Sequence, residues 1–139
     1  MVKKLFLICS LFLISCNSKI DKNKLHLLNG YWEIKEVAFK DGTKKKYSIN
    51  STVDYIELDS VTGYRKKVNP KFNGTFETSN DAESFEIRVS NDTVFMKYTN
   101  NSNTWEEVLT SLTEESFSVK NNEGVTYLYN RFEPINITP

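Results

Sequence analysis

Few side chains in this sequence could carry out chemistry. The chain of 139 residues holds one histidine, His26, and two cysteines, Cys9 and Cys16. A thiol nucleophile needs a base beside it, and a metal site needs several converging ligands. The paired acids Glu106 and Glu107 fall in an expected strand, where neighbouring side chains point to opposite faces and cannot meet on one ion. We therefore predict no catalytic residue, no metal site and no cofactor.

The first fifteen residues have the composition of an export signal. Lys3 and Lys4 make a basic start, and Leu5–Ile14 is an apolar run relieved only by Cys9 and Ser10. A helix needs about 20 apolar residues to span a bilayer, so this run is too short to remain as a membrane span. We expect the segment to be removed on export.

The apolar run ends in Leu13-Ile14-Ser15-Cys16, which resembles the lipobox of bacterial lipoproteins. In that family the cysteine thiol receives a diacylglycerol, a peptidase cuts before the cysteine, and the new amine is usually acylated. The resemblance implies that Cys16 carries two or three acyl chains such as palmitate, enough to anchor a protein stably on a membrane. Asn17 stands where some inner-membrane lipoproteins have Asp, which favours the outer membrane with the domain facing the periplasm. A Gram-positive host is the alternative.

The rest of the chain divides into a tether, one domain and a tail. We assign residues 1–15 to the signal, 16–28 to the lipidated cysteine and a polar tether, 29–134 to the domain and 135–139 to the tail. The chain has 18 basic and 18 acidic residues, and loss of Lys3 and Lys4 with the signal leaves a formal net charge of −2. This balance argues against nucleic acid as a partner. Lys44–Lys46 and Arg65–Lys67 would form one basic patch only if their strands were neighbours.

The domain has the composition of a β-protein. Aromatic residues make up 13% of the chain and alternate with Thr, Val and Ile in short runs separated by turn residues. Spacing of this kind is typical of sandwiches and barrels. The expected strands are Tyr31–Phe39, Lys45–Ile49, Val53–Asp59, Val61–Val68, Phe72–Thr78, Ser84–Ser90, Thr93–Thr99, Thr104–Thr110, Ser116–Lys120 and Val125–Phe132, of which some must merge or fail.

Tight turns between consecutive strands predict an all-β, antiparallel up-and-down meander of about eight to ten strands. Closure of such a meander into a small barrel removes its exposed edges. Gly30-Tyr31-Trp32 at the start of the first strand and Arg131 at the end of the last strand resemble lipocalins and the lipocalin-like domains of bacterial lipoproteins. The resemblance implies that Arg131 packs over Trp32 at the closed end of the barrel.

Two functions remain open from the sequence. The first is a binding module for a small, partly apolar ligand, with Tyr98, Trp105, Tyr127 and Tyr129 as candidate ligand-binding residues. The second is an envelope protein–protein interaction or inhibitor module with a filled barrel and no small-molecule ligand. If Arg131 points inward, the residues that share its face are mostly bulky, so we expect at most a shallow, partly aromatic pocket at the open mouth.

Overall fold

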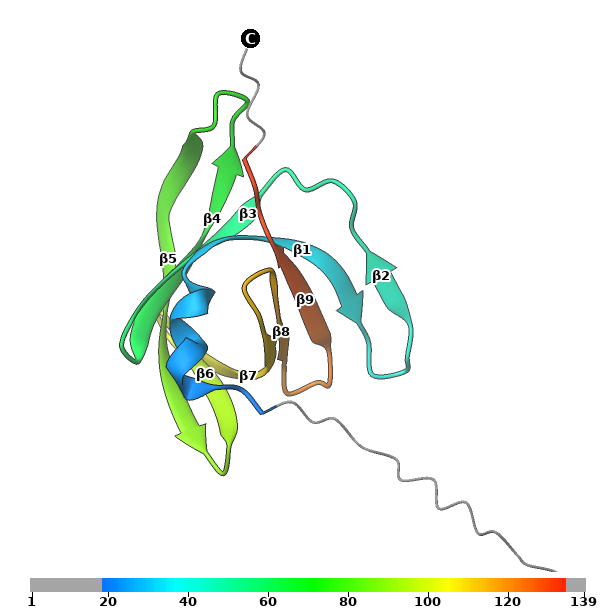
Figure 1. Ribbon diagram of the computed structural model, residues 1–139, viewed down its shortest axis with the longest axis vertical. Coiled ribbons are helices and arrows are strands. Elements are labelled where there is room, and N and C mark those ends of the chain that lie inside the picture. The colour runs from blue at the N-terminus through cyan, green and yellow to red at the C-terminus, as the bar shows by residue number, and fades with distance from the viewer. Residues whose placement is uncertain (1–18, 135–139) are drawn as a thin grey trace, which may run out of the picture.

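One short helix and nine strands make up residues 19–134, the part of the chain that the computed structural model describes (Figure 1). The 3-10 helix η1 spans Lys22–Leu28. The strands are β1 (Gly30–Ala38), β2 (Lys44–Lys46), β3 (Val53–Asp59), β4 (Thr62–Pro70), β5 (Phe76–Ser90), β6 (Thr93–Asn100), β7 (Asn103–Leu112), β8 (Ser116–Lys120) and β9 (Thr126–Arg131). Phe72–Thr78 and Ser84–Ser90 do not form two strands, because one long strand, β5, includes residues 76–78 of the first and all of the second.

Eight of these strands close into a barrel. Each strand from β3 to β9 pairs antiparallel with the next, and β1 pairs with β3 on one edge and with β9 on the other. β2 pairs only with the end of β1 and lies outside the ring (Figure 1). The predicted all-β, antiparallel meander closing into a small barrel is confirmed, and its closure pairs the strand edges that an open sheet would leave exposed.

Alternation along the strands decides which side chains enter the barrel. In β5, Phe85 and Ile87 are buried whereas Glu86 between them is exposed. Val89, Trp105 and Tyr127 are partly buried against the core. The buried core consists of Leu28, Trp32, Ile56, Phe85, Ile87, Val94, Met96, Tyr98, Leu109, Phe117, Val119 and Tyr129. Because residues 19–134 contain this whole core and every barrel strand, the domain can be studied without the first eighteen residues.

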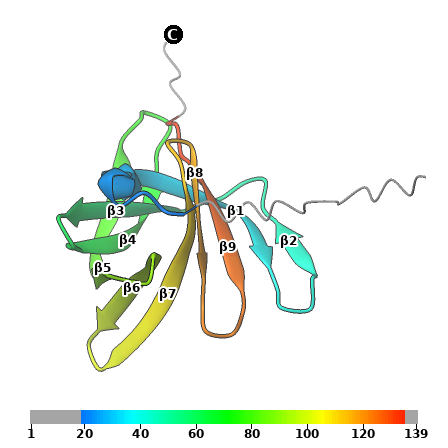
Figure 2. The same cartoon turned by 60° about the horizontal axis from the view of Figure 1, so that its bottom comes forward.

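The helix η1 closes one end of the barrel. It contacts both β3 and β7, and it lies across the ring of strands (Figures 1 and 2). Its last residue, Leu28, is fully buried, and Leu25 packs against the core. Residues 22–28 were assigned to the tether from their polarity, but these leucines give the segment an apolar face that the barrel buries.

Arg131 stabilises this closed end through stacking and hydrogen bonds. Its guanidinium lies 3.8 Å from the ring centre of Trp32. Its three nitrogens donate to the carbonyls of Glu114 (3.0 Å), Asn29 (2.6 Å) and Leu27 (2.9 Å). The side chain of Arg131 thereby joins β9 to residues 27–32 and to Glu114, which are distant from one another in sequence.

Gly30 makes room for this arginine. It has a φ of +121°, and a Cβ atom there would lie 2.6 Å from Arg131 Nη1. Trp32 itself is fully buried, and its Nε1–H donates to the Leu28 carbonyl at 2.8 Å. Gly30, Trp32 and Arg131 thus lie together at the closed end.

The two basic runs do not form one patch. β2, which carries Lys44–Lys46, neighbours β1 only, whereas β4 lies between β3 and β5. Arg65 moreover points into the barrel, where its side chain is buried. The turn end of the β4–β5 hairpin, where β5 begins at Phe76, packs against β1 through aromatic rings. Phe76 stacks on Tyr31 of β1 with ring centres 4.0 Å apart.

Candidate functional site

A pocket opens at the end of the barrel opposite η1. β3 runs from Asp54, which lines the pocket, to Leu58, whose N–H donates to Asn29 Oδ1 at 2.7 Å just beyond η1. The pocket has a volume of about 740 Å³ and is lined from β3, β4, β5, β6, β7 and β9. We call it the mouth pocket. Its size lies within the range of roughly 300–1,000 Å³ that is usual for small-molecule sites.

A buried cluster of charged groups forms one wall of the mouth pocket. Asp54 is 2% exposed and Arg65 is 9% exposed. Arg65 Nη2 donates to Asp54 Oδ2 at 2.7 Å and to the Tyr129 hydroxyl at 2.6 Å. Asp54 Oδ1 forms no hydrogen bond of good geometry but lies 2.6 Å from Lys67 Nζ, so charge pairing satisfies this oxygen. Inward alternation on β3 and β4 places these side chains together.

The two cations keep Asp54 ionised. Burial raises the pKa of this carboxyl, but the attraction of Arg65 and Lys67 outweighs burial and holds the pKa below its ordinary value. Burial also raises the pKa of Tyr129 to about 12, so its hydroxyl keeps its proton at physiological pH. The cluster is therefore a carboxylate held between two cations and beside a neutral phenol.

Two other buried polar atoms of this region have no hydrogen-bond partner among the described residues. They are the Tyr98 hydroxyl and Glu107 Oε2. Burial raises the pKa of Tyr98 to about 12 and raises the pKa of Glu107 above its ordinary value. A buried polar atom without a partner costs roughly 1–3 kcal/mol, so Glu107 Oε2, which lines the pocket, creates a demand for a partner from outside the protein. The Tyr98 hydroxyl instead lies close enough to Arg65 for the guanidinium to oppose the effect of burial on its pKa.

The four aromatic residues expected to bind ligand gather here, although not in equal positions. Trp105, Tyr127 and Tyr129 line the mouth pocket. Tyr98 is 1% exposed and lies behind Trp105, its ring stacked on the indole with centres 5.3 Å apart at an interplanar angle of 7°. The aromatic wall therefore faces the pocket through Trp105, with Tyr98 supporting it.

Comparison with known proteins gives likenesses of fold. The structure is similar to a lipocalin-like protein from Bacteroides uniformis, with 12% identity, a TM-score of 0.48, and coverage of 76% of this chain and 99% of that one. It is similar to an uncharacterized protein from Bacteroides eggerthii at 14% identity, TM-score 0.47 and the same coverages. Lobster apocrustacyanin A1 matches at 13% identity and TM-score 0.44, over 88% of this chain and 74% of that one. No family model and no curated protein matches the sequence. The fold assigned here rests on the strand pairing of this chain.

The charged residues of the mouth pocket were missed from the sequence. Asp54, Arg65 and Glu107 lie in expected strands, but none of them was expected to line a binding site, since charged side chains are usually exposed. Strand parity carried the signal: Asp54 alternates with Ile56 on β3, and Glu107 lies between Trp105 and Leu109 on β7. A charged residue on the apolar face of an expected strand is therefore the sequence signal that indicates a buried polar site.

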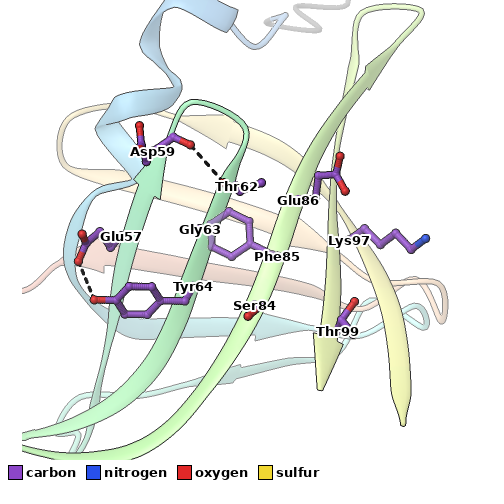
Figure 3. Close-up of a pocket in the computed structure, with 10 residues that line it drawn as sticks. All are labelled: Glu57, Asp59, Thr62, Gly63, Tyr64, Ser84, Phe85, Glu86, Lys97 and Thr99. Atoms are coloured by element: carbon purple, nitrogen blue, oxygen red, sulfur yellow. Dashed lines mark hydrogen bonds between the residues drawn. The ribbon is translucent and has the colours of Figure 1, made fainter. Parts of the chain in front are cut away.

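A second hollow lies on the outside of the barrel and differs in kind. It has a volume of about 550 Å³ and crosses the outer faces of β3 to β6 (Figure 3). Its principal polar groups already pair with each other: the Tyr64 hydroxyl donates to Glu57 Oε2 at 2.6 Å, which raises the pKa of Tyr64 to about 12. Phe85 lies against Gly63 in its floor (Figure 3). This hollow leaves no buried polar group in need of a partner, so we place the candidate site at the mouth.

Within residues 19–134, no three His, Cys, Asp or Glu side chains come together in an arrangement that could hold a metal ion. His26 lies on η1 with its Nδ1 at 3.1 Å from the Asn23 carbonyl oxygen, in an exposed position. No helix in the described part of the chain is long and apolar enough to cross a membrane. The lipobox cysteine, Cys16, lies outside the described residues.

Proposed function

We propose that this protein is a lipid-anchored binding protein of the bacterial envelope that holds a small, partly apolar molecule in its mouth pocket. The observation that carries the binding proposal is the mouth pocket itself, where Glu107 has a buried carboxylate oxygen without a partner beside an aromatic wall. Small-molecule sites typically combine apolar walls with a few well-placed polar groups of this kind.

Packing at the closed end supports a site at the mouth. Trp32, Phe117 and Leu28 are fully buried there, and the Trp32 and Phe117 rings meet edge to face with centres 4.7 Å apart. Side chains thus fill this end, as is usual in narrow eight-stranded barrels. A ligand would enter only as far as the layer of Arg65, Tyr98 and Tyr129. This proposal favours a compact molecule over a long acyl chain.

Anchoring is supported by the sequence alone, through the lipobox that ends at Cys16. We expect the mature protein to begin at Cys16, to carry palmitate or a similar chain, and to reside in the outer membrane facing the periplasm. Growing the native host with an alkyne-tagged palmitate should label the wild-type protein. Cys16→Ala should give an unlabelled, uncleaved or mislocalised precursor, because no other thiol acceptor follows the apolar run. An unlabelled wild-type protein would refute the anchor.

A second candidate function is interaction with another envelope protein. Ile49 is 91% exposed and Phe72 is 80% exposed, and both line an apolar hollow of about 250 Å³ together with Phe76 and Phe132. Clustered exposed apolar side chains are a feature of interaction surfaces. Native mass spectrometry of the protein from its own host separates the two functions, because a small molecule retained by the barrel supports the first and a protein lost on Phe72→Ser supports the second.

A further inference from the structure

We propose that the mouth pocket selects a ligand whose polar end is uncharged and offers a hydrogen-bond acceptor and a donor side by side, as a carboxamide, urea or lactam does. This inference rests on the proposed binding function and names the ligand class. The acceptor would meet Arg65, and the donor would meet Glu107. The apolar body would lie against Trp105.

The Arg65 side of the pocket supplies hydrogen-bond donors on a guanidinium whose positive charge is already paired with Asp54. A guanidinium has five N–H groups, and Arg65 Nη2 uses its two for Asp54 and Tyr129. Its Nε and Nη1 carry the remaining N–H groups on a side chain that lines the pocket. Because Asp54 pairs with both Arg65 and Lys67, a ligand acceptor can bond to the guanidinium without having to bring a negative charge.

The opposite side of the pocket supplies an acceptor. Glu107 lies on β7, three strands away from the β4 strand of Arg65 in the order of the sheet, so the two residues stand on different walls of the eight-stranded ring. Glu107 Oε2 is buried without a partner, and so is the hydroxyl of nearby Tyr98. A ligand N–H in the pocket would satisfy the Glu107 carboxylate oxygen.

Charges around Glu107 disfavour a ligand with a net charge. Glu107 is influenced by Arg65 from β4, by Asp54 from β3 and by Glu83 from β5. A ligand carboxylate would enter beside the acidic residues Glu107, Asp54 and Glu83. A ligand ammonium would enter beside the cations Arg65 and Lys67. Around the pocket, four acidic residues (Asp54, Asp81, Glu83 and Glu107) face three basic residues (Arg65, Lys66 and Lys67), so neither sign of charge dominates the lining. A ligand with an uncharged polar end avoids repulsion from the acidic residues and from the cations. Its acceptor can bond to Arg65 on one wall and its donor to Glu107 on the other.

Three probes with one shared aromatic body test this inference: 2-naphthamide, 2-naphthoate and 2-naphthylmethylammonium. The chain has two tryptophans, Trp32 at the closed end and Trp105 at the mouth, so their indole N–H signals in NMR report where each probe binds. In a titration of the domain, 2-naphthamide should bind at least about tenfold more tightly than either charged probe, as expected for one well-made hydrogen bond. It should move the Trp105 signal and leave that of Trp32 in place.

Substitutions at Glu107 show whether the carboxylate is responsible. Glu107→Met removes the acceptor and should weaken 2-naphthamide binding about tenfold. Glu107→Gln keeps an acceptor oxygen but removes the charge, so it should retain 2-naphthamide within about threefold and bind 2-naphthoate more tightly than the wild type does. Glu106→Met is the matched control, because Glu106 lies on the outer face beside Arg88 and should change neither probe.

Two results would count against these proposals in different ways. If 2-naphthoate or 2-naphthylmethylammonium binds the wild type as tightly as 2-naphthamide, or if Glu107→Met leaves the ranking unchanged, the ligand class is wrong while mouth binding stands. If no probe moves the Trp105 signal, the proposed binding function itself fails.

Discussion

Replacing Asp54 with alanine should lower the free energy of unfolding by about 3–5 kcal/mol. The change removes the carboxylate that accepts from Arg65 at 2.7 Å and lies 2.6 Å from Lys67 Nζ. Lys67 can turn to solvent, since its side chain is 66% exposed, but Arg65 would keep its charge in a buried site with only the Tyr129 hydroxyl as a partner. Urea unfolding followed by circular dichroism measures the loss.

Asp59→Ala is the control for this experiment. Asp59 is an exposed aspartate at the other end of β3, and its loss should change stability by no more than about 0.5 kcal/mol. If Asp54→Ala also falls within that range, the buried ion pair does not support the fold as the geometry indicates.

The same carboxylate predicts how stability depends on pH. The pKa of Asp54 is lower in the folded protein than its unfolded value of roughly 3.9, so the folded state favours the ionised form. Its contribution is complete above the unfolded pKa and is lost as the pH falls through the folded pKa. The stability difference between wild type and Asp54→Ala should therefore be constant near neutrality and shrink below about pH 4. A difference that grows on acidification would contradict the assignment.

Trp32→Ala should cost about 3–5 kcal/mol, the range found for large-to-small changes at buried aromatic positions. Trp32 is fully buried and meets Phe117 edge to face. The substitution also deprives the Leu28 carbonyl of its indole donor and the Arg131 guanidinium of the ring beneath it. Thermal and urea unfolding of the domain would measure the effect.

Trp105→Ala is a matched control because it removes the same side chain from the partly buried mouth. We expect it to cost less than half as much as Trp32→Ala, since Trp105 borders an open pocket and leaves less of a sealed cavity. Equal losses at the two positions would mean that the closed end is not the better packed part of the barrel.

The barrel could be predicted because its signals are local. Alternation in β5 to β9 and turn residues such as Asn91 and Asp92, both at positive φ, define hairpins one after another. The packing of Arg131 on Trp32 at the closed end was expected from a family resemblance carried by a short motif at each end of the domain.

What could not be predicted depends on partners far apart in the sequence. Residues 79–83 fall between two expected strands, yet they continue β5 because Glu83 pairs with Arg65 and Ala82 with Lys66 in the neighbouring strand. Cross-strand pairing of this kind overrides local propensity. The helical spacing around residues 24–28 is too short to predict η1 from the sequence, and the barrel end that η1 covers provides the surface on which its leucines pack.

The charged wall of the mouth was hidden for a related reason. Arg65 belongs to a basic triplet with Lys66 and Lys67, and such runs are commonly solvated. Only the register, which pairs Arg65 with Ile56 and Lys67 with Asp54, shows that alternate members of this triplet face inward. The candidate aromatic residues could be named from the sequence. The charged groups that would hydrogen-bond to the ligand could be identified only once the strand pairing of the closed barrel was known.

Native mass spectrometry of the protein purified from its native host tests the central claim most directly. We expect the wild type to carry a small molecule that is released on denaturation, and Glu106→Met to retain it. Trp105→Ala should lose much of it, because this substitution removes the aromatic wall of the mouth pocket. A wild-type protein that carries no small molecule, or one whose bound molecule is unaffected by Trp105→Ala, would contradict a binding site at the mouth.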